Sequence, residues 1–261
     1  MESGMRTNPV RRDLGEGKTA LGTMVFEFAT PGIARIVAAA GADFVIFDQE
    51  HSGWGIDTIR TLMATARAAD VVPLVRVPAT QYHSIARPLD VGASGVMVPM
   101  VETAEQAVLV VSSAKYPPQG NRGAAFGIAH DDYEAPVDPM SSMQNANDEA
   151  LVIVQIETRR GLENVEEIAA VEGVDVLWVG HNDLTNSMGI PGQFDHPDYL
   201  RAVDRFLEVC DYKGKAPGIM STSVDEARMQ LEQGFRCVAY WGDIWLYASA
   251  LRQGLAAIRE D

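Results

Sequence analysis

Two carboxylates, Glu157 and Asp183, each follow a short apolar run and are well suited by type and spacing to bind a metal. The preceding runs, Leu151–Ile156 and Val176–Val179, have the branched composition of parallel strands that are buried on both faces. Each acid is therefore expected where a strand ends, and two carboxylates that meet there suit a hard cation such as Mg²⁺ or Mn²⁺. Alternatively, each acid caps the following helix or pairs with one of the two arginines after Glu157. The repetition in successive units favours the metal site.

A second group of ionisable residues follows the apolar run Phe44–Phe47, where Asp48, Glu50 and His51 fall within four positions. Asp48 is close enough in sequence for its carboxylate to hold the imidazole of His51 in one tautomer. An imidazole oriented in this way is a candidate general base, because its ordinary pKa lies near neutrality. The alternative is a histidine that only forms hydrogen bonds within the loop.

Arg76 ends the apolar run that begins at Val72. A guanidinium in that position is expected to meet an anion, and its planar fork matches a carboxylate or a phosphate. The alternative is a structural salt bridge to Asp48 or Glu157.

Three residues precede Asp183 at the end of another run: Gly180, His181 and Asn182. Backbone N–H groups at the entrance to a helix could receive a carboxylate there. His181 is either a second acid/base group or a wall of the site. Met220, after a later run, is expected to influence acceptor specificity together with Trp54 and Phe126.

Eight short apolar runs predict the strands that would position these residues, with helical patterns between most of them. They are Ala20–Val25, Phe44–Phe47, Val72–Val75, Gly95–Val98, Leu151–Ile156, Val176–Val179, Ala216–Ile219 and Cys237–Tyr240. Alternating strands and helices with a count of eight favour a (β/α)₈ TIM barrel, whose active site lies at the C-terminal ends of the strands. A doubly wound open sheet is the alternative, weakened because no glycine-rich nucleotide loop follows the first run.

The chain is expected to comprise an N-terminal arm over residues 1–18 and one barrel domain over residues 19–261. A helix is expected with Pro31 at its start and Gly41 at its end. The long connection between residues 116 and 150 is expected to contain a short helix around Pro139–Asn147 and otherwise to be a surface excursion.

The composition, with 47% hydrophobic and 22% charged residues, is typical of a globular enzyme with a sizeable core. A net charge of −15 argues against a nucleic-acid partner and against an anionic membrane surface. The two cysteines do not form a disulfide scaffold. We expect a cytoplasmic protein, because we find neither a membrane-spanning run nor the apolar core of a signal peptide.

A hard cation, an arginine and a histidine together suit a 2-oxo acid, whose carbonyl the metal would polarise toward an enolate. Schiff-base chemistry has little support, because none of the lysines follows a predicted strand directly. The four lysines are Lys18, Lys115, Lys213 and Lys215.

The segments DQEH, RVP, LDVGASGVMVPMVET, KYPPQGNRG, VQIETRRGLENVEEIAAVEGVDVLWVGHNDL and KAPGI, between Phe44 and Trp241, resemble the HpcH/HpaI aldolase family. These are metal-dependent class II pyruvate aldolases with a barrel fold. The resemblance implies a divalent metal (Mg²⁺ or Mn²⁺, with Co²⁺ a further option) and two small substrates, a 2-oxo acid and an aldehyde. The chain departs from the commonest pattern at His181, where many members have proline.

The roles that the resemblance implies are a His51–Asp48 dyad for acid/base chemistry and Arg76 stabilising the pyruvate enolate. Glu157 and Asp183 would ligate the metal, Gln155 would lie beside pyruvate, and amides from Gly180 to Asp183 would bind its carboxylate. The resemblance also implies a homohexamer made of two trimers, or a homotrimer. In this assembly the C-terminal helix would pack on a neighbour, and Asp90 would reach a neighbouring active site.

The expected reaction is reversible cleavage of a 4-hydroxy-2-oxo acid to pyruvate and an aldehyde. Oxaloacetate decarboxylation, or a reaction like that of macrophomate synthase, is the alternative, because it passes through the same enolate. Acyl-CoA lyase chemistry is disfavoured by the lack of a visible basic patch for the phosphates of coenzyme A. A non-catalytic role would require the full set of site residues to be relics.

Overall fold

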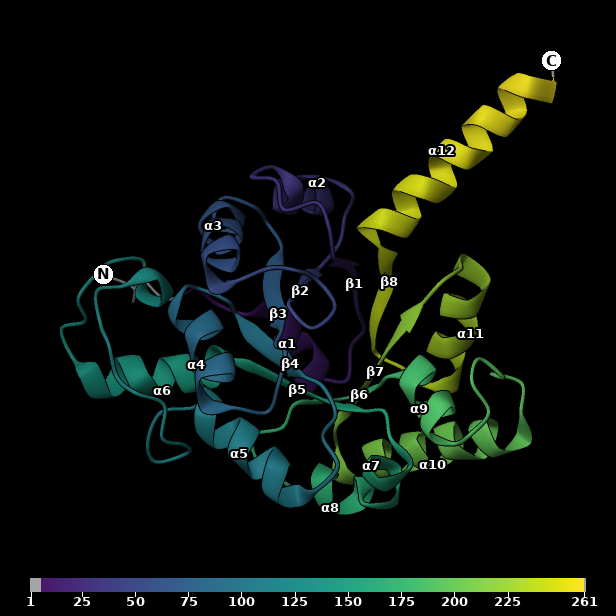
Figure 1. Ribbon diagram of the computed structural model, residues 1–261. Helices are drawn as coiled ribbons and strands as arrows, with labels where there is room; N and C mark the ends of the chain where they lie inside the picture. Colours follow the sequence, from purple (N-terminus) through teal and green to yellow (C-terminus); the bar gives the residue numbers. More distant parts are fainter. Residues whose placement is uncertain (1–5, 261) are drawn as a thin grey trace.

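The computed structural model describes residues 6–260, and its centre is a closed barrel of eight parallel strands in chain order (Figure 1). The strands are β1 (Ala20–Val25), β2 (Phe44–Asp48), β3 (Val72–Arg76), β4 (Gly95–Val98), β5 (Leu151–Ile156), β6 (Val176–Val179), β7 (Ala216–Ser221) and β8 (Cys237–Gly242). All eight predicted runs form strands. Because β1 pairs with β8, the sheet has no edge, and the alternative of an open sheet is wrong.

The helices lie outside the barrel or at its ends (Figure 1). They are α1 (Pro9–Gly15), α2 (Ile33–Ala39), α3 (Ile56–Ala66), α4 (Tyr82–Asp90), α5 (Ala104–Ala114), the 3₁₀ turn η1 (Ala129–Asp131), α6 (Pro139–Glu149), α7 (Arg159–Glu163), α8 (Val165–Ala169), α9 (His181–Ser187), α10 (Pro197–Lys213), α11 (Val224–Gln233) and α12 (Asp243–Glu260). The expected helix in the long connection is confirmed as α6, capped by the Asp138 side chain.

The expected helix at Pro31 begins two residues later than predicted, at Ile33. Pro31 and Gly32 form a turn, which Ile33 closes by donating its N–H to the carbonyl of Thr30 at 3.2 Å. Its predicted end is confirmed, since Gly41 follows the helix with a φ of +87°.

Two apolar layers result from the alternation of side chains along each strand. Val45 and Phe47 point outward and pack with the helices, in a large cluster that also contains Ile59 and Leu62 of α3. Inside the barrel a second cluster contains Phe44 and Ile46 of β2, Leu74 of β3, Ile153 of β5 and Trp178 of β6. The wide Trp178 fits because its neighbour in β7 is a glycine, and a Cβ on Gly218 would collide with the indole.

The segment before β1 contains helix α1, which the sequence analysis did not predict. Its start combines the Asn8 side-chain cap with Pro9 in the first turn. Val10 and Leu14 of α1 belong to the cluster inside the barrel, so this helix covers the N-terminal end. The remainder of the expected arm, residues 1–5, lies outside the described residues.

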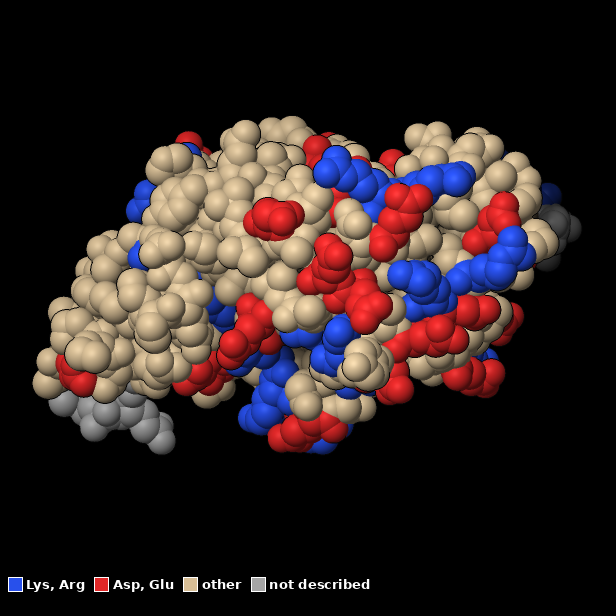
Figure 2. All heavy atoms as spheres, turned by 90° about the horizontal axis from the view of Figure 1, so that it is seen from below, with Lys and Arg blue, Asp and Glu red and all other residues tan. Residues whose placement is uncertain are grey.

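Helix α12 extends away from the barrel instead of covering it (Figure 1). Its large apolar side chains are exposed, with Tyr247 at 60% and Ile258 at 73% of their full areas. None of the helices between residues 6 and 260 combines the length and apolar character needed to cross a bilayer. On the face drawn in Figure 2, lysines and arginines lie among aspartates and glutamates rather than in a basic stripe.

Candidate active site

The alternation of strand residues that builds the interior also carries polar side chains to the C-terminal mouth of the barrel. In β2, Phe44 and Ile46 point inward, and Asp48 is the next residue on the same face. Arg76 holds the corresponding position in β3 and is the register partner of Asp48. The mouth is therefore the top layer of the barrel interior.

Asp48 and Arg76 form a buried ion pair, with 2.6 Å between Arg76 Nε and Asp48 Oδ1. Arg76 Nη1 also lies 3.1 Å from Glu50 Oε2. The structural salt bridge that was the alternative reading of Arg76 is thus present. Asp48 at Nε and Glu50 near Nη1 hold the guanidinium from two directions, and Arg76 also lines the cavity at the mouth. This arrangement orients the cation toward a substrate rather than leaving it flexible.

Asp48 contacts the backbone of the following loop and not the imidazole of His51. Its carboxylate accepts hydrogen bonds from the N–H groups of Glu50 at 3.2 Å and His51 at 2.8 Å. The imidazole is half exposed, and its Nε2 lies 3.8 Å from Glu50 Oε2. In this conformation Asp48 therefore positions the loop that carries His51, and the tautomer contact expected from sequence is not among the hydrogen bonds of the described residues.

Glu157 follows Leu151, Ile153 and Gln155 on the inward face of β5 and is buried to 1% exposure. Its Oε1 accepts the N–H of Met100 at 2.6 Å, and its Oε2 accepts a hydrogen bond from the Gln155 amide. Burial raises the pKa of Glu157 to about 7, with further increases from the neighbouring charges of Glu50 and Asp183.

Met100, two residues after β4, holds Glu157 through its backbone N–H. Its φ of +56° lies in the left-handed region that residues with side chains seldom adopt. Trp241, at the end of β8, has a φ of +53°. Backbone strain of this kind is commonly retained at functional sites.

Gly180 leads from β6 into α9 and packs directly on the Glu157 side chain. A Cβ at this position would overlap Glu157 Oε2 and lie 2.7 Å from Gln155 Nε2. Only glycine leaves room for that contact. Asp183 lies in the first turn of α9, where it is exposed at the rim of the mouth.

His181 is buried at the edge of the mouth, where its ring stands edge-on to Phe194 at 5.3 Å. Burial lowers the pKa of His181 and so favours the neutral imidazole. Of the two readings from the sequence, the packing supports a wall of the site.

A cavity of about 260 Å³ joins these residues at the mouth. From the predicted set, it is lined by His51, Arg76, Gln155, Gly180, His181, Asn182, Asp183 and Met220. Trp54 instead packs against the outer layer, and Phe126 lies in the segment between α5 and α6, so neither lines this cavity.

Phe26 and Trp245 also line the mouth, and sequence reasoning missed both. The Phe26 ring lies 5.7 Å from Arg76 Cζ, and Trp245 packs edge-on against Phe26 at 4.9 Å. Asp243 holds this loop by accepting the N–H groups of Phe26, Glu27 and Phe28 at 2.7–3.0 Å. Asp243, an acidic residue directly after the last strand, was the sequence feature that could have indicated this loop.

Asp90, which the resemblance assigns to a neighbouring active site, lies away from the mouth of its own subunit. It ends α4, on the side from which β4 begins, and Arg122 binds it with 2.6 Å between Nη2 and Oδ1. The lysines lie away from the mouth as well, because each precedes a strand or ends a helix.

The residues of the mouth fit a divalent cation. The three carboxylates of Glu50, Glu157 and Asp183 lie near enough to repel one another, and burial raises the pKa of Glu50 too. Gln155 Oε1 is buried without a hydrogen-bond partner. Among residues 6–259 no three His, Cys, Asp or Glu side chains form a ready ligand cluster. A cation held by two carboxylates would complete its shell with substrate or water oxygens, as Mg²⁺ commonly does.

Comparison with known proteins connects this geometry to enzymes. The model of the HpcH/HpaI aldolase/citrate lyase family matches residues 23–250. Hydroxypyruvate/pyruvate aldolase from Cupriavidus necator is 37% identical over 97% of this chain and 93% of its own. The 2-keto-3-deoxy-L-rhamnonate aldolase from Klebsiella pneumoniae is 36% identical over 98% of this chain and 94% of its own. The crystal structure of an HpcH/HpaI aldolase from Desulfitobacterium hafniense superposes with a TM-score of 0.91 at 34% identity, covering 96% of both chains.

Proposed function

This chain belongs to the HpcH/HpaI aldolase/citrate lyase family, and from this membership we propose that it is a class II pyruvate aldolase. It reversibly cleaves a 4-hydroxy-2-oxo acid into pyruvate and an aldehyde. The observation that carries this conclusion is the convergence of Arg76, Glu157 and His51 at one barrel mouth, with a cavity of about 260 Å³ between the strand ends.

Glu157 and Asp183 would hold the divalent cation, for which Mg²⁺ and Mn²⁺ are the first candidates. When bound, the cation supplies Lewis-acid polarisation of the 2-oxo group. Side chains and backbone groups of this chain would bind the substrate and transfer the proton.

Arg76 and Gln155 would hold the 2-oxo acid. Asp48 and Glu50 occupy Nε and Nη1 of Arg76, which leaves Nη2 for the negative charge that develops on the substrate oxygen. The Gln155 amide donates to Glu157, so it fixes the carboxylate while facing the cavity. The N–H groups between Gly180 and Asp183 lie at the same rim and would receive the substrate carboxylate.

His51 would act as the acid/base group. In cleavage, it accepts the proton of the C4 hydroxyl, the C3–C4 bond breaks, the aldehyde forms and the bond electrons pass to the pyruvate enolate. A proton then returns to C3. Because the ring is half exposed and Asp48 holds its backbone, His51 can exchange protons with water between turnovers.

We propose that the enzyme works as an assembly, a homohexamer of two trimers or a homotrimer. The exposed apolar side chains of α12 support this, since a stable monomer seldom extends such a helix into solvent. An apolar groove lies beside β1 and α2, next to the start of α12, and its volume is about 430 Å³. The α12 of a neighbour would cover such a surface, and Asp90 would contribute to a neighbouring mouth.

The decisive experiment follows hydrogen–deuterium exchange of the pyruvate methyl group by NMR in D₂O. Exchange with Mg²⁺ or Mn²⁺ that stops in excess chelator is expected. An Asp183→Ala variant should lose metal binding and exchange together. Exchange that persists in chelator would overturn the metal assignment, and no exchange under any condition would overturn the enolate chemistry.

A His51→Ala variant separates binding from proton transfer. It should lose aldol cleavage by about 100-fold or more while binding pyruvate nearly as well as the wild type. Equal losses in both measurements would contradict its role as the base.

A further inference from the structure

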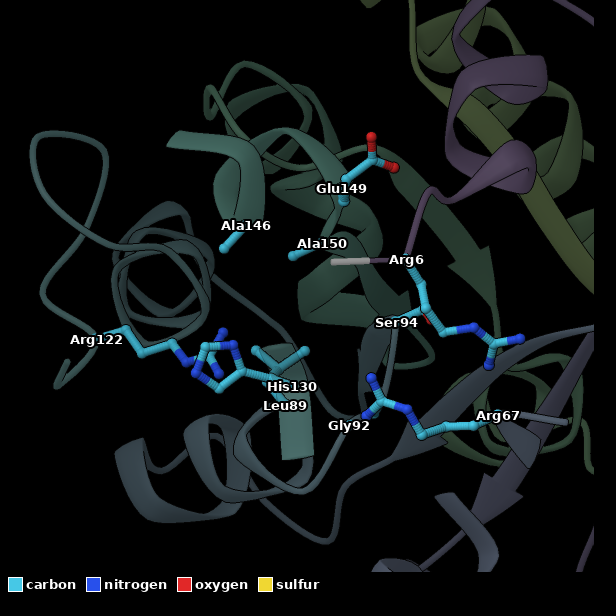
Figure 3. A pocket seen from close by; sticks show the side chains of 11 residues that line it. Arg6, Arg67, Leu89, Gly92, Ser94, Arg122, His130, Ala146, Glu149 and Ala150 are labelled. Atoms are coloured by element: carbon cyan, nitrogen blue, oxygen red, sulfur yellow. The ribbon is translucent and has the colours of Figure 1, made fainter. Parts of the chain in front are cut away.

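A second cavity lies at the opposite end of the barrel, near the residues that precede β4 and β5 (Figure 3). Its volume is about 50 Å³. The N-terminal segment, the end of α3 and the segment between α5 and α6 contribute its basic side chains, Arg6, Arg67, Arg122 and His130. Glu149 is the acidic side chain of this lining. We call this space the arginine cavity.

Buried polar atoms without a hydrogen-bond partner gather at two places in the described part of the chain. Glu50 Oε2 and Gln155 Oε1 belong to the mouth. The other four are Arg67 Nη2, Tyr116 Oη, His130 Nδ1 and Asp131 Oδ1. A buried polar group that lacks a partner costs about 1–3 kcal/mol, so a cluster of four indicates a polar occupant at this second place.

Of these four residues Arg67 and His130 line the arginine cavity, and Tyr116 and Asp131 are neighbours of His130. The Arg67 guanidinium donates to the carbonyl of Ala129, next to His130. The rings of His130 and Tyr116 are 6.4 Å apart, and Arg122 Cζ lies 4.7 Å from the Tyr116 ring centre. Gly127 donates its N–H to the other oxygen of Asp131 at 2.8 Å.

The three arginines of this cavity also make structural contacts, but these contacts do not use all of the polar atoms. Arg6 donates to the carbonyls of Ala66 and Ala69 at the end of α3. Arg67 Nε lies 2.9 Å from Asp132, and Arg122 Nε and Nη2 bind Asp90. Among the residues that line the arginine cavity, these bonds leave Arg67 Nη2 and His130 Nδ1 without a hydrogen-bond partner.

These two unpartnered atoms define what the occupant must offer. His130 Nε2 lies 2.7 Å from the carbonyl oxygen of Ala125 and donates to it, so in the neutral ring Nδ1 is an acceptor. The imidazole is only 7% exposed. An occupant that meets the neutral ring therefore donates to His130 and accepts from Arg67 Nη2, in surroundings with three guanidinium groups.

We propose that the arginine cavity binds a hydrogen phosphate group, either free phosphate or the end of a small phosphomonoester. Its anionic oxygens accept from the arginines, and its P–O–H donates to His130 Nδ1. The space holds about four water-sized atoms, enough for the oxygens of one such group. The arginine cavity lies apart from the mouth of its own subunit, and its Arg122 binds Asp90, the residue proposed for a neighbouring mouth.

Calorimetric titration of the full, metal-free chain with inorganic phosphate at constant ionic strength tests the proposal. One saturable site per chain is expected. Arg67→Gln and His130→Phe should each weaken binding by about tenfold or more, as the loss of one charged or buried hydrogen bond predicts. Arg76→Gln, at the mouth, is the matched control and should bind phosphate as the wild type does.

Two further ligands test whether the site needs a hydrogen-bond donor and whether it accepts a phosphomonoester. Sulfate lacks the donor at neutral pH and should bind more weakly than phosphate; equal affinities would overturn the assignment. Glycerol 3-phosphate should bind at the same site if the monoester is the natural ligand, whereas binding of inorganic phosphate alone identifies the free ion.

The proposal is overturned if phosphate gives no saturable heat, which would mean that water alone fills the cavity. It is equally overturned if Arg76→Gln rather than His130→Phe weakens binding. The His130→Phe variant keeps a ring of similar size, so it carries the test should Arg67→Gln fail to fold.

Discussion

Replacing Lys115 by methionine should change how the stability of this protein depends on pH without removing its activity. Lys115 is 1% exposed, and its Nζ donates to the carbonyls of Asn147 and Ala150 at 2.5 Å each. Burial lowers the pKa of Lys115 from 10.5 to about 8. Such a pKa is typical of lysines that form Schiff bases. Lys115, however, follows α5 and binds the residue before β5, at the end of the barrel opposite the mouth.

The direction in which stability changes with pH depends on how many protons Lys115 binds in the folded and in the unfolded chain. Below about pH 8 Lys115 is protonated in both states, and its contribution does not vary. Between about pH 8 and 10.5 the unfolded chain binds more protons, so the free energy of unfolding rises with pH. The difference between the two pKa values corresponds to about 3 kcal/mol. This is an upper limit, because the two carbonyls favour the ammonium form.

Urea unfolding of the wild type and of Lys115→Met at several pH values between 7.5 and 10.5 measures this contribution. The free energy of unfolding of the wild type should rise relative to the variant across that interval, and titrations of tyrosines and cysteines cancel in the difference. Parallel curves would refute the reasoning. The variant should also retain aldolase turnover, and borohydride with pyruvate should inactivate neither protein.

Three further predictions concern the mouth and the assembly. Gly180→Ala should weaken Mn²⁺ binding by about 10- to 100-fold, because the new methyl group displaces the buried carboxylate beside it; unchanged affinity in a metal titration would contradict this packing. Asp243→Ala should lower the free energy of unfolding by about 2–3 kcal/mol, because the Phe26–Phe28 loop loses its charged acceptor. The same change should raise KM for the 2-oxo acid. Denaturation measures the first effect and steady-state kinetics the second. Leu251→Glu combined with Ile258→Glu should reduce the assembly size in light scattering, whereas an unchanged mass would exclude α12 from the interface.

Much of the barrel could be predicted because its signal is local. Each strand is a short branched run, and parallel strands that close into a barrel bring all their C-terminal ends to one mouth. Once the strand at Phe44 was assigned, the alternation of side chains sufficed to place Asp48 inside it and Arg76 on its neighbour. Gly180 and Asp183 were expected directly after the strand at Val176, and they lie there, at the N-cap and in the first turn of α9.

The partners of these residues could not be predicted, because several donors and acceptors compete within a few ångströms. The sequence alone left Asp48 free to bind the His51 ring, but the fold directs it to the loop backbone and Arg76. Phe126 seemed equally eligible for the mouth. Its segment precedes β5, however, so the chain direction carries it toward the other end.

The sequence by itself determined the strands, the barrel and the set of polar residues at its mouth, because these depend on the burial and alternation of near neighbours. Only the tertiary structure decided that Asp243 fixes the loop at Phe26, a contact across 217 positions. The same holds for the arginine cavity, which the N-terminal segment, α3 and the connection before α6 build together. Closure of the barrel creates such contacts, and no local pattern encodes which distant groups meet when it closes.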